Sequence, residues 1–204
     1  MKIHQFHRAF ASSGLLLTAT ATIIIATCAQ AAPFANGDFE LNSIYPAPAV
    51  VLPQGSSALP DWTVGGTAGA VSVEDGLERG IIPFSGAQWI AFHPGNTGAG
   101  GTLTQTFSTV AGESNVVSLA LSKDANGVGL NPVSLTVTVW DGDGNLLAND
   151  WFAPQEKGVW TVFQLPFVAT ANSATIVLED SSVETSIALC LDEVVVGAGG
   201  GVAV

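Results

Sequence analysis

Residues 133–140 constrain the fold of this chain more than any other stretch. In Val-Ser-Leu-Thr-Val-Thr-Val-Trp, every second residue is aliphatic. A period of two predicts a half-buried β-strand, because successive side chains of a strand point to opposite faces. It places Val133, Leu135, Val137 and Val139 on the core face and Trp140 on the other. Outside the N-terminal segment, no window has the 3.6-residue apolar spacing of a helix, so we predict an all-β domain.

Other short β-prone runs are separated by clusters of Gly, Pro, Asn and Asp. Residues 83–109 are predicted to form a strand, a glycine-rich loop and a strand. Asn36-Gly37 predicts a turn that leads into a short strand through Glu40, and residues 41–60 predict a long loop. About nine or ten strands with this spacing predict an antiparallel two-sheet β-sandwich. The predicted strands include residues 59–64, 70–74, 88–92, 103–107, 116–122, 133–140, 159–167, 174–178 and 187–196.

The first 31 residues have the pattern of a signal peptide. Lys2 and Arg8 precede an apolar run, and Ala29-Gln30-Ala31 is a small-x-small cleavage pattern. We therefore predict a signal peptide over 1–31, a single β-sandwich domain over 32–196 and a flexible Gly-rich tail over 197–204. Lipidation of Cys28 is the alternative interpretation of the same segment.

The net charge of the predicted mature domain limits the kinds of molecule that it can bind. Residues 32–204 hold three basic side chains against 17 acidic ones, a formal charge of −14. This balance argues against nucleic acid and against anionic membranes, which both require cationic patches. Because charged residues are only 11% of the chain, the polar surface is mostly uncharged and suits neutral partners such as glycans. Cys190 lies in an apolar run and is interpreted as a buried small hydrophobe.

No motif in the domain specifies catalysis. Asp141 to Asn145 begins like a calcium loop but lacks the later glycine and glutamate, so a hairpin turn is the better interpretation. His93 has no G-x-S-x-G nucleophile to serve, and we interpret it as a polar loop residue or a hydrogen-bonding group in a ligand cleft. Carboxylates that could still form a glycosidase pair are Glu74, Asp75, Glu78, Glu179, Asp180 and Glu184.

Tryptophans supply the candidate ligand-binding surface. Trp62 and Trp89 lie in apolar strand contexts and are predicted to be core. Trp140 faces away from the core, and Trp151 lies on the returning strand, so the two indoles could approach each other as a platform for a sugar ring. Packing against the second sheet or a loop is the alternative. We predict ligand binding by Trp140, Trp151, His93 and the loop amide Asn96.

Four pieces of the domain resemble, in order, the DUF642 and "choice-of-anchor C" secreted domains: residues 36–40 (NGDFE), 59–64 (LPDWTV), 103–107 (LTQTF) and 191–196 (LDEVVV). The resemblance implies a galactose-binding-like jelly roll that binds polysaccharide without catalysis. Plant members resemble two such domains in tandem, whereas this chain has room for one. Anchored bacterial members end in a sorting signal that Gly199 to Val204 does not match, which implies release or loose association.

Related jelly-roll carbohydrate-binding modules often hold a structural calcium between their first and last strands. The resemblance places the matching carboxylates at Glu40 and Asp192. Calcium prefers six to eight oxygens, so backbone carbonyls would have to complete the shell. Carboxylates that cap strand ends or face solvent are the alternative.

Taken together, these features predict a non-enzymatic carbohydrate-binding module that is secreted to the extracellular space or the cell envelope. Its expected partner is a cell-wall or extracellular polysaccharide, with no nucleic acid and no membrane insertion after signal cleavage. A structural or adhesive matrix protein with a protein partner is the alternative function.

Overall fold

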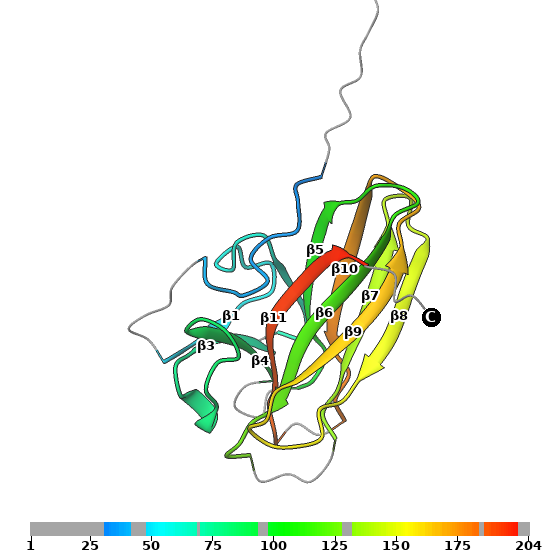
Figure 1. The fold of residues 1–204 in the computed structure, drawn as a ribbon. Helices are drawn as coiled ribbons and strands as arrows, with labels where there is room; N and C mark the ends of the chain where they lie inside the picture. Colours follow the sequence, from blue (N-terminus) through cyan, green and yellow to red (C-terminus); the bar gives the residue numbers. More distant parts are fainter. Residues whose placement is uncertain are drawn as a thin grey trace, which may run out of the picture.

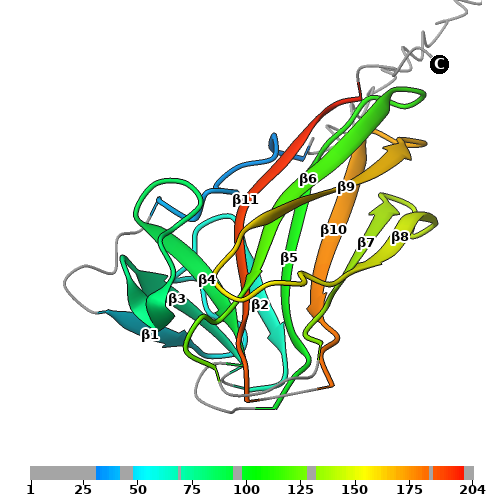
Figure 2. The ribbon, with the colours of Figure 1, turned by 60° about the horizontal axis from the view of Figure 1, so that its bottom comes forward.

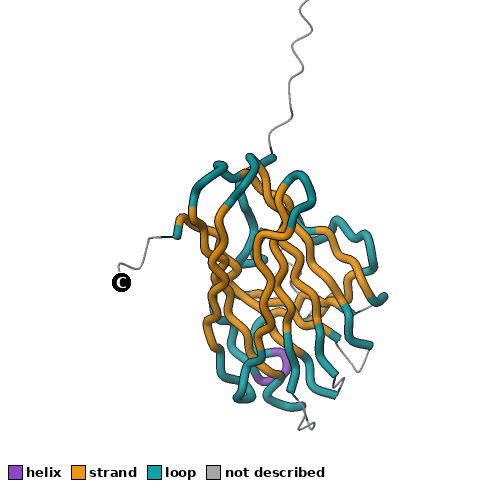
Figure 3. Tube along the Cα trace, turned by 90° about the vertical axis from the view of Figure 1, so that its right-hand side faces the viewer, coloured by secondary structure: helices purple, strands orange, loops and turns teal. Residues whose placement is uncertain are grey.

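The computed structural model describes residues 31–41, 48–68, 70–93, 98–127, 132–183 and 186–199. Strands make up most of this part of the chain, and the single short 3-10 helix in it is η1 (Glu78–Gly80). Figure 3 shows strands running between loops that gather at the two ends of the molecule. The predicted all-β class is therefore confirmed.

Two antiparallel sheets form a β-sandwich (Figures 1 and 2). Sheet A has the order β1-β3-β4-β11-β6-β9, and sheet B has the order β2-β5-β10-β7-β8. The strands of sheet A are β1 (Ala49–Leu52), β3 (Val71–Asp75), β4 (Gln88–Phe92), β11 (Leu189–Ala198), β6 (Ser114–Lys123) and β9 (Thr161–Val168). Those of sheet B are β2 (Thr63–Gly66), β5 (Gly101–Ser108), β10 (Ser173–Asp180), β7 (Leu135–Asp141) and β8 (Leu146–Phe152).

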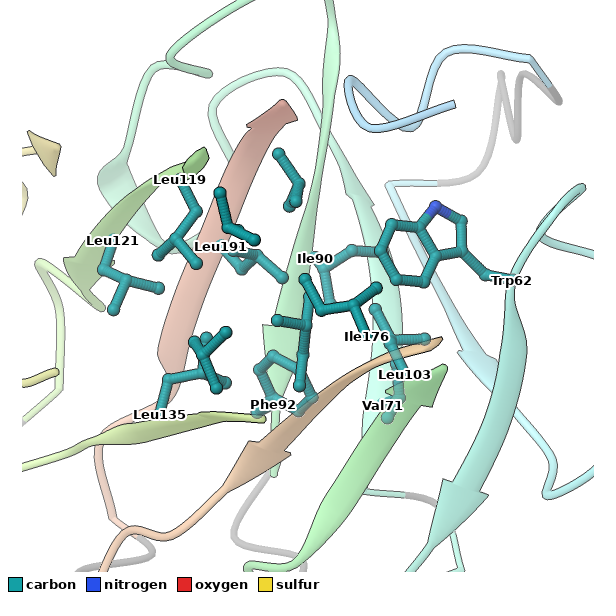
Figure 4. Close-up of a cluster of buried hydrophobic side chains, with 14 of the residues drawn as sticks. Trp62, Val71, Ile90, Phe92, Leu103, Leu119, Leu121, Leu135, Ile176 and Leu191 are labelled. Carbon is teal, nitrogen blue, oxygen red and sulfur yellow. The ribbon is translucent and has the colours of Figure 1, made fainter. Parts of the chain in front are cut away.

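The main core lies between the two sheets (Figure 4). Val133, Leu135, Val137 and Val139 are all fully buried, as their alternation predicts. Trp62 and Trp89 are also buried, at 3% and 0% exposure. The period of two is thus the pattern that defines which face of β7 contacts the core.

The last strand of the chain is a central one. β11 pairs with β4 on one side and with β6 on the other, and Figure 1 shows it in red between them. It runs to Ala198, with Gly197 opposite Val116 and Ala198 opposite Asn115. The prediction that the flexible tail begins at Gly197 was therefore wrong at its start.

Two local predictions in the N-terminal part were also wrong. Residues 37–41 form turns rather than a strand, and Phe39 has a φ of 61°. The buried contact of its ring with Trp62 holds that backbone conformation, which local propensity disfavours. The expected loop over 41–60 contains β1, whose four residues pair with β3.

Phe34 and Ala35 of the N-terminal segment pack against sheet B and are hydrogen-bonded to it. The Gln105 side chain donates to the Ala35 carbonyl and accepts from the Ala35 N–H, both at 2.9 Å. The Phe34 ring meets Trp62 and Phe107 edge-on, with centroids 5.7 and 5.5 Å away. The side-chain amide of Gln105 thus pairs with the backbone of Ala35 as a peptide group of an adjacent strand would, because it supplies one donor and one acceptor.

A second, smaller core covers the outer side of sheet A. Ile81, Trp89, Ala91, Ala188 and Cys190 form this cluster. Burial confirms that Cys190 is an interior residue, and it raises the pKa of the thiol well above its ordinary value. A high pKa keeps the sulfur in its unreactive thiol form.

Arg79 lies beside this second cluster and forms ion pairs with two carboxylates. Its guanidinium contacts Glu74 at 3.1 Å and Asp124 at 3.5 Å. Glu74 also accepts a hydrogen bond from the Ser72 hydroxyl at 2.5 Å. Glu74 is 1% exposed, so it is a structural carboxylate with partners on both sides.

Candidate functional site

The outer side of sheet B carries a surface that we call the threonine face. Burial alternates along β5, β7 and β10, so every second side chain of these strands points away from the core. The register aligns those outward positions in rows across the sheet. The face consists of Thr63, Thr102, Thr104, Thr106, Thr136, Thr138, Trp140, Asn149, Trp151, Thr175, Val177 and Glu179.

Both candidate tryptophans belong to the threonine face. The exposed fractions are 38% for Trp140 and 55% for Trp151, so neither indole is buried against the second sheet or a loop. Trp151 is opposite Thr136, whereas Trp140 is opposite Leu146. The rise along β7 from Thr136 to Trp140, combined with one strand spacing, separates the backbones of the two tryptophans by about 14 Å. The indoles therefore share a face but are not cross-strand partners.

Hydroxyl groups cover the area between and beside the two indoles. Thr106 and Thr175 lie opposite each other on β5 and β10, with their hydroxyls 2.8 Å apart. The five strands of sheet B contain no Lys or Arg. Glu179, in the middle strand, is the one charged side chain at the outward positions of this described sheet. The result is a hydroxyl-rich surface that carries two exposed indoles, a single carboxylate and no cationic side chain in the described sheet.

The β7–β8 hairpin next to Trp140 is held by Asp141. Its carboxylate accepts hydrogen bonds from the Thr170 hydroxyl at 2.6 Å, from the Asn145 N–H at 2.8 Å and from the Asp143 N–H at 3.0 Å. The Asn145 amide also donates to it. Hydrogen bonds from Thr170 and Asn145 lower the pKa of Asp141 to about 2. The predicted turn is confirmed, and its carboxylate is used within the protein.

His93 lies in the interior, away from the threonine face. It follows β4 directly and has no exposed surface. Its Nδ1 is 2.5 Å from the Asp180 carboxylate, and its Nε2 contacts the Ile187 carbonyl. The ring therefore joins the end of β4 to the segment between β10 and β11. Asn96, the other candidate from the loop after β4, lies outside the described residues.

The candidate calcium ligands Glu40 and Asp192 hold one loop, residues 84–88. One Glu40 oxygen accepts from the N–H groups of Ala87 and Gln88, both at 2.7 Å. One Asp192 oxygen accepts from Phe84 and Ser85, at 2.8 and 3.0 Å. The two carboxylates thus divide the backbone donors of this loop between them.

This donor set is small for a calcium ion. Calcium takes six to eight oxygens, and no group of three His, Cys, Asp or Glu side chains that could hold a metal lies in the described ranges. Burial raises the pKa of Asp192 from its ordinary 3.8 to about 7, although backbone N–H groups of Ser85, Glu193 and Phe84 oppose the shift. Calcium binding by Glu40 and Asp192 stays a prediction.

The two tryptophans of the face were among the residues predicted from the sequence, but its threonines were not. The signal was present, because Thr102, Thr104 and Thr106 alternate with buried residues on one strand. Thr136 and Thr138 do the same on another. What the sequence could not show is that β10 lies between these two strands.

Solved structures share the fold at low sequence identity. The carbohydrate-binding module TmCBM61, determined in complex with β-1,4-galactotriose, has a TM-score of 0.57 and 15% identity over 81% of this chain and 97% of its own. The enzymatically active domain of tailspike protein 4 from bacteriophage CBA120 has a TM-score of 0.53 and 18% identity over 82% of this chain and 21% of its own. A search of curated proteins gave no match.

In the residues that the structure describes, no helix is both long and apolar enough to cross a bilayer.

The family comparison covers the whole sandwich. The model named "Protein of unknown function (DUF642)" matches residues 32–196, which run from the N-terminal segment into β11. The match includes all four segments on which the resemblance rested. This chain therefore belongs to the DUF642 family.

Proposed function

We propose that this protein is an exported, non-catalytic carbohydrate-binding module, and that its threonine face binds a polysaccharide chain. The observation that carries the proposal is the placement of two exposed indoles on one hydroxyl-rich sheet face that has no Lys or Arg. A partly exposed indole offers a flat apolar plate for the C–H side of a sugar ring. Threonine hydroxyls donate and accept hydrogen bonds, as sugar hydroxyls require.

The spacing of the indoles favours a chain over a single sugar. A backbone separation of about 14 Å exceeds the width of one sugar ring, so a ligand that contacts both tryptophans needs several linked units. The shared fold with a module that was solved with a bound galactotriose supports the same ligand class.

The non-catalytic part of the proposal rests on the carboxylates. Glycoside hydrolysis generally uses two carboxyl groups about 5 to 9.5 Å apart across the bound sugar. The outward positions of sheet B in the described structure carry one, Glu179. Of the other carboxylates considered, Glu74 is bound by Arg79 and Asp180 by His93.

Affinity electrophoresis tests the proposal. The domain of residues 32–204 is run through gels that contain single polysaccharides, beginning with β-1,4-galactan and hydroxyethylcellulose. Trp140→Ala and Trp151→Ala should each weaken retardation at least ten-fold, since anchoring aromatic residues often contribute about 2 kcal/mol or more and about 1.4 kcal/mol is ten-fold. Phe84→Ala is the matched control, because Phe84 is 44% exposed and its ring packs on Trp160 rather than on the threonine face.

Two results would reject the proposed site. Free migration of the unmodified domain in every gel would reject binding to the polysaccharides tested. Retardation that survives both tryptophan substitutions would move the site away from this face. The same gels run with calcium and with EDTA test whether Glu40 and Asp192 hold a metal that binding requires. Equal retardation under the two conditions would reject that role.

A structural or adhesive role is the second candidate, and one observation favours it. Five exposed apolar side chains lie on sheet A and the segment that precedes β4: Ile82, Phe84, Val162, Val168 and Val195. Such side chains fit a protein partner better than a glycan. A mass that increases with concentration in sedimentation equilibrium would support this role, and a constant monomer mass would count against self-association.

A further inference from the structure

We propose that Glu179 determines which polysaccharides the threonine face accepts, by admitting uncharged chains and excluding anionic ones. This inference rests on the proposed function, because it assigns a selective role to one residue of the same face. It goes beyond that function by naming the charge class of the ligand.

Glu179 lies beside the path of a chain that contacts both indoles. It is on β10, the middle strand of sheet B, opposite Thr102 on one side and Thr136 on the other. Trp151 occupies the same row on the far side of Thr136. Two strand spacings separate Glu179 from Trp151, or about 10 Å between backbones. A chain that contacts both indoles runs mainly along β7 and β8, so the sugar substituents on the β10 side of the unit stacked on Trp151 are the ones that face Glu179.

Nothing in the described structure neutralises this carboxylate. The side chain of Glu179 is exposed, and the ion pairs of the described residues are made by Arg79 and His93 with other carboxylates. Sheet B has no Lys or Arg to balance it. The neighbours of Glu179 across the sheet are Thr102 and Thr136, which carry no charge.

A free carboxylate at this position treats the two classes of glycan differently. The hydroxyl groups of a neutral sugar can donate charge-assisted hydrogen bonds to it, which are stronger than neutral ones. A uronate or carboxymethyl group placed over it brings two negative charges together while water is being excluded. Repulsion grows as the local dielectric falls, and no cation of the described sheet offsets it.

The total charge of the domain must be separated from this local effect. A formal charge of −14 repels any polyanion at low salt. At about 0.15 M salt the screening length is about 8 Å, so distant charges contribute little while a charge in direct contact still acts. Discrimination that persists at about 0.15 M and about 0.5 M salt thus reports on contact residues.

Two matched pairs of polymers serve as probes, each with one backbone and two charge states. The first pair is hydroxyethylcellulose and carboxymethylcellulose. The second is β-1,4-galactan and the same galactan oxidised at C6 to the uronate. The unmodified domain should bind the neutral member of a pair at least ten-fold more tightly than the anionic one.

Glu179→Gln should raise affinity for the anionic member at least ten-fold and leave binding of the neutral member within a few-fold. Glu179→Lys should go further and reverse the preference. Glu78→Gln is the control, because it removes the same charge from η1 on the opposite side of the sandwich and should leave the ratio unchanged. Circular dichroism melting curves establish that each variant is folded.

The outcomes separate this inference from the function on which it rests. If both tryptophan variants lose retardation while Glu179→Gln and Glu179→Lys leave the anionic-to-neutral ratio unchanged, the role of Glu179 is overturned and the binding face stands. If the unmodified domain prefers the anionic polymers, the selective role is overturned as well. If the tryptophan variants bind normally, the face is not the site and both proposals fail.

Discussion

Asp192 gives the domain a stability that should fall as pH rises. Its side chain is completely buried, and burial raises its pKa from 3.8 to about 7. In the unfolded chain the carboxyl loses its proton near the ordinary value. Between these two values the folded state binds more protons than the unfolded state, so the free energy of unfolding decreases with increasing pH.

The size of the effect follows from the two pKa values. Integrating the proton-binding difference from pH 5 to pH 8 gives a loss of about 3 kcal/mol, at about 1.4 kcal/mol per pH unit where the difference is complete. Asp141 does not add to this slope, because a pKa lowered to about 2 leaves it ionised in both states above pH 5. The window from pH 5 to 8 therefore suits a test of Asp192.

Urea unfolding at pH 5, 6, 7 and 8 measures the slope directly. Asp192→Asn should be nearly flat over this range, since an amide has no proton to lose, although its absolute stability at pH 5 should be lower. The loss at pH 5 is expected because the amide NH₂ group would face the Glu193 N–H, which now donates to Asp192 at 2.7 Å. Asp38→Asn, at an exposed carboxylate of the N-terminal segment, should keep the slope. A wild-type protein that gains stability from pH 5 to 8, or an unchanged slope in the Asp192→Asn variant, would refute the assignment.

Three further substitutions test other parts of the structure. Asp141→Asn should lower stability at pH 7. Because the folded pKa is depressed to about 2, this difference should shrink as pH falls from about 4 toward 2, which acid unfolding curves measure. Gln105→Leu should lower the free energy of unfolding by about 2 kcal/mol in urea, since it leaves the Ala35 N–H and carbonyl without their partner. Phe107→Ala should lower it by about 3–5 kcal/mol, because the ring is 1% exposed in the main core, whereas Thr104→Ala at the surface should change it by less than about 0.5 kcal/mol.

Residue pattern alone was enough for the sandwich and for most of its core. The alternation through Val139 identified the buried face of β7, and the same pattern placed Trp140 outside, because a strand has only two sides. β1 was missed because its four residues stand among prolines that indicate a loop. The positive φ of Phe39 could not be predicted, because tertiary contacts with Trp62 hold it against local preference.

The candidate site was harder to predict from the sequence, because its contacts join residues that are far apart in the chain. The His93–Asp180 contact joins residues 87 positions apart, so nothing in the local sequence indicated that this histidine is buried rather than exposed in a loop. Glu40 and Asp192 both contact residues 84–88, but their partners there are backbone N–H groups, which no sequence motif displays. Glu179 was one of many carboxylates until the strand order and register placed it on the middle strand of the threonine face, in the same row as Trp151.

The central position of β11 has a consequence for how the protein is made. A chain that has emerged only as far as β10 can pair β3 with β4 and β6 with β9, but nothing yet joins these two halves of sheet A. The inner edges of β4 and β6 stay open until residues 189–198, the last strand of the sandwich, have been synthesised. For a chain proposed to cross a membrane before folding, this order delays closure of the sheet until the last strand of the domain is available. A chain truncated before β11 lacks the strand that joins the two halves.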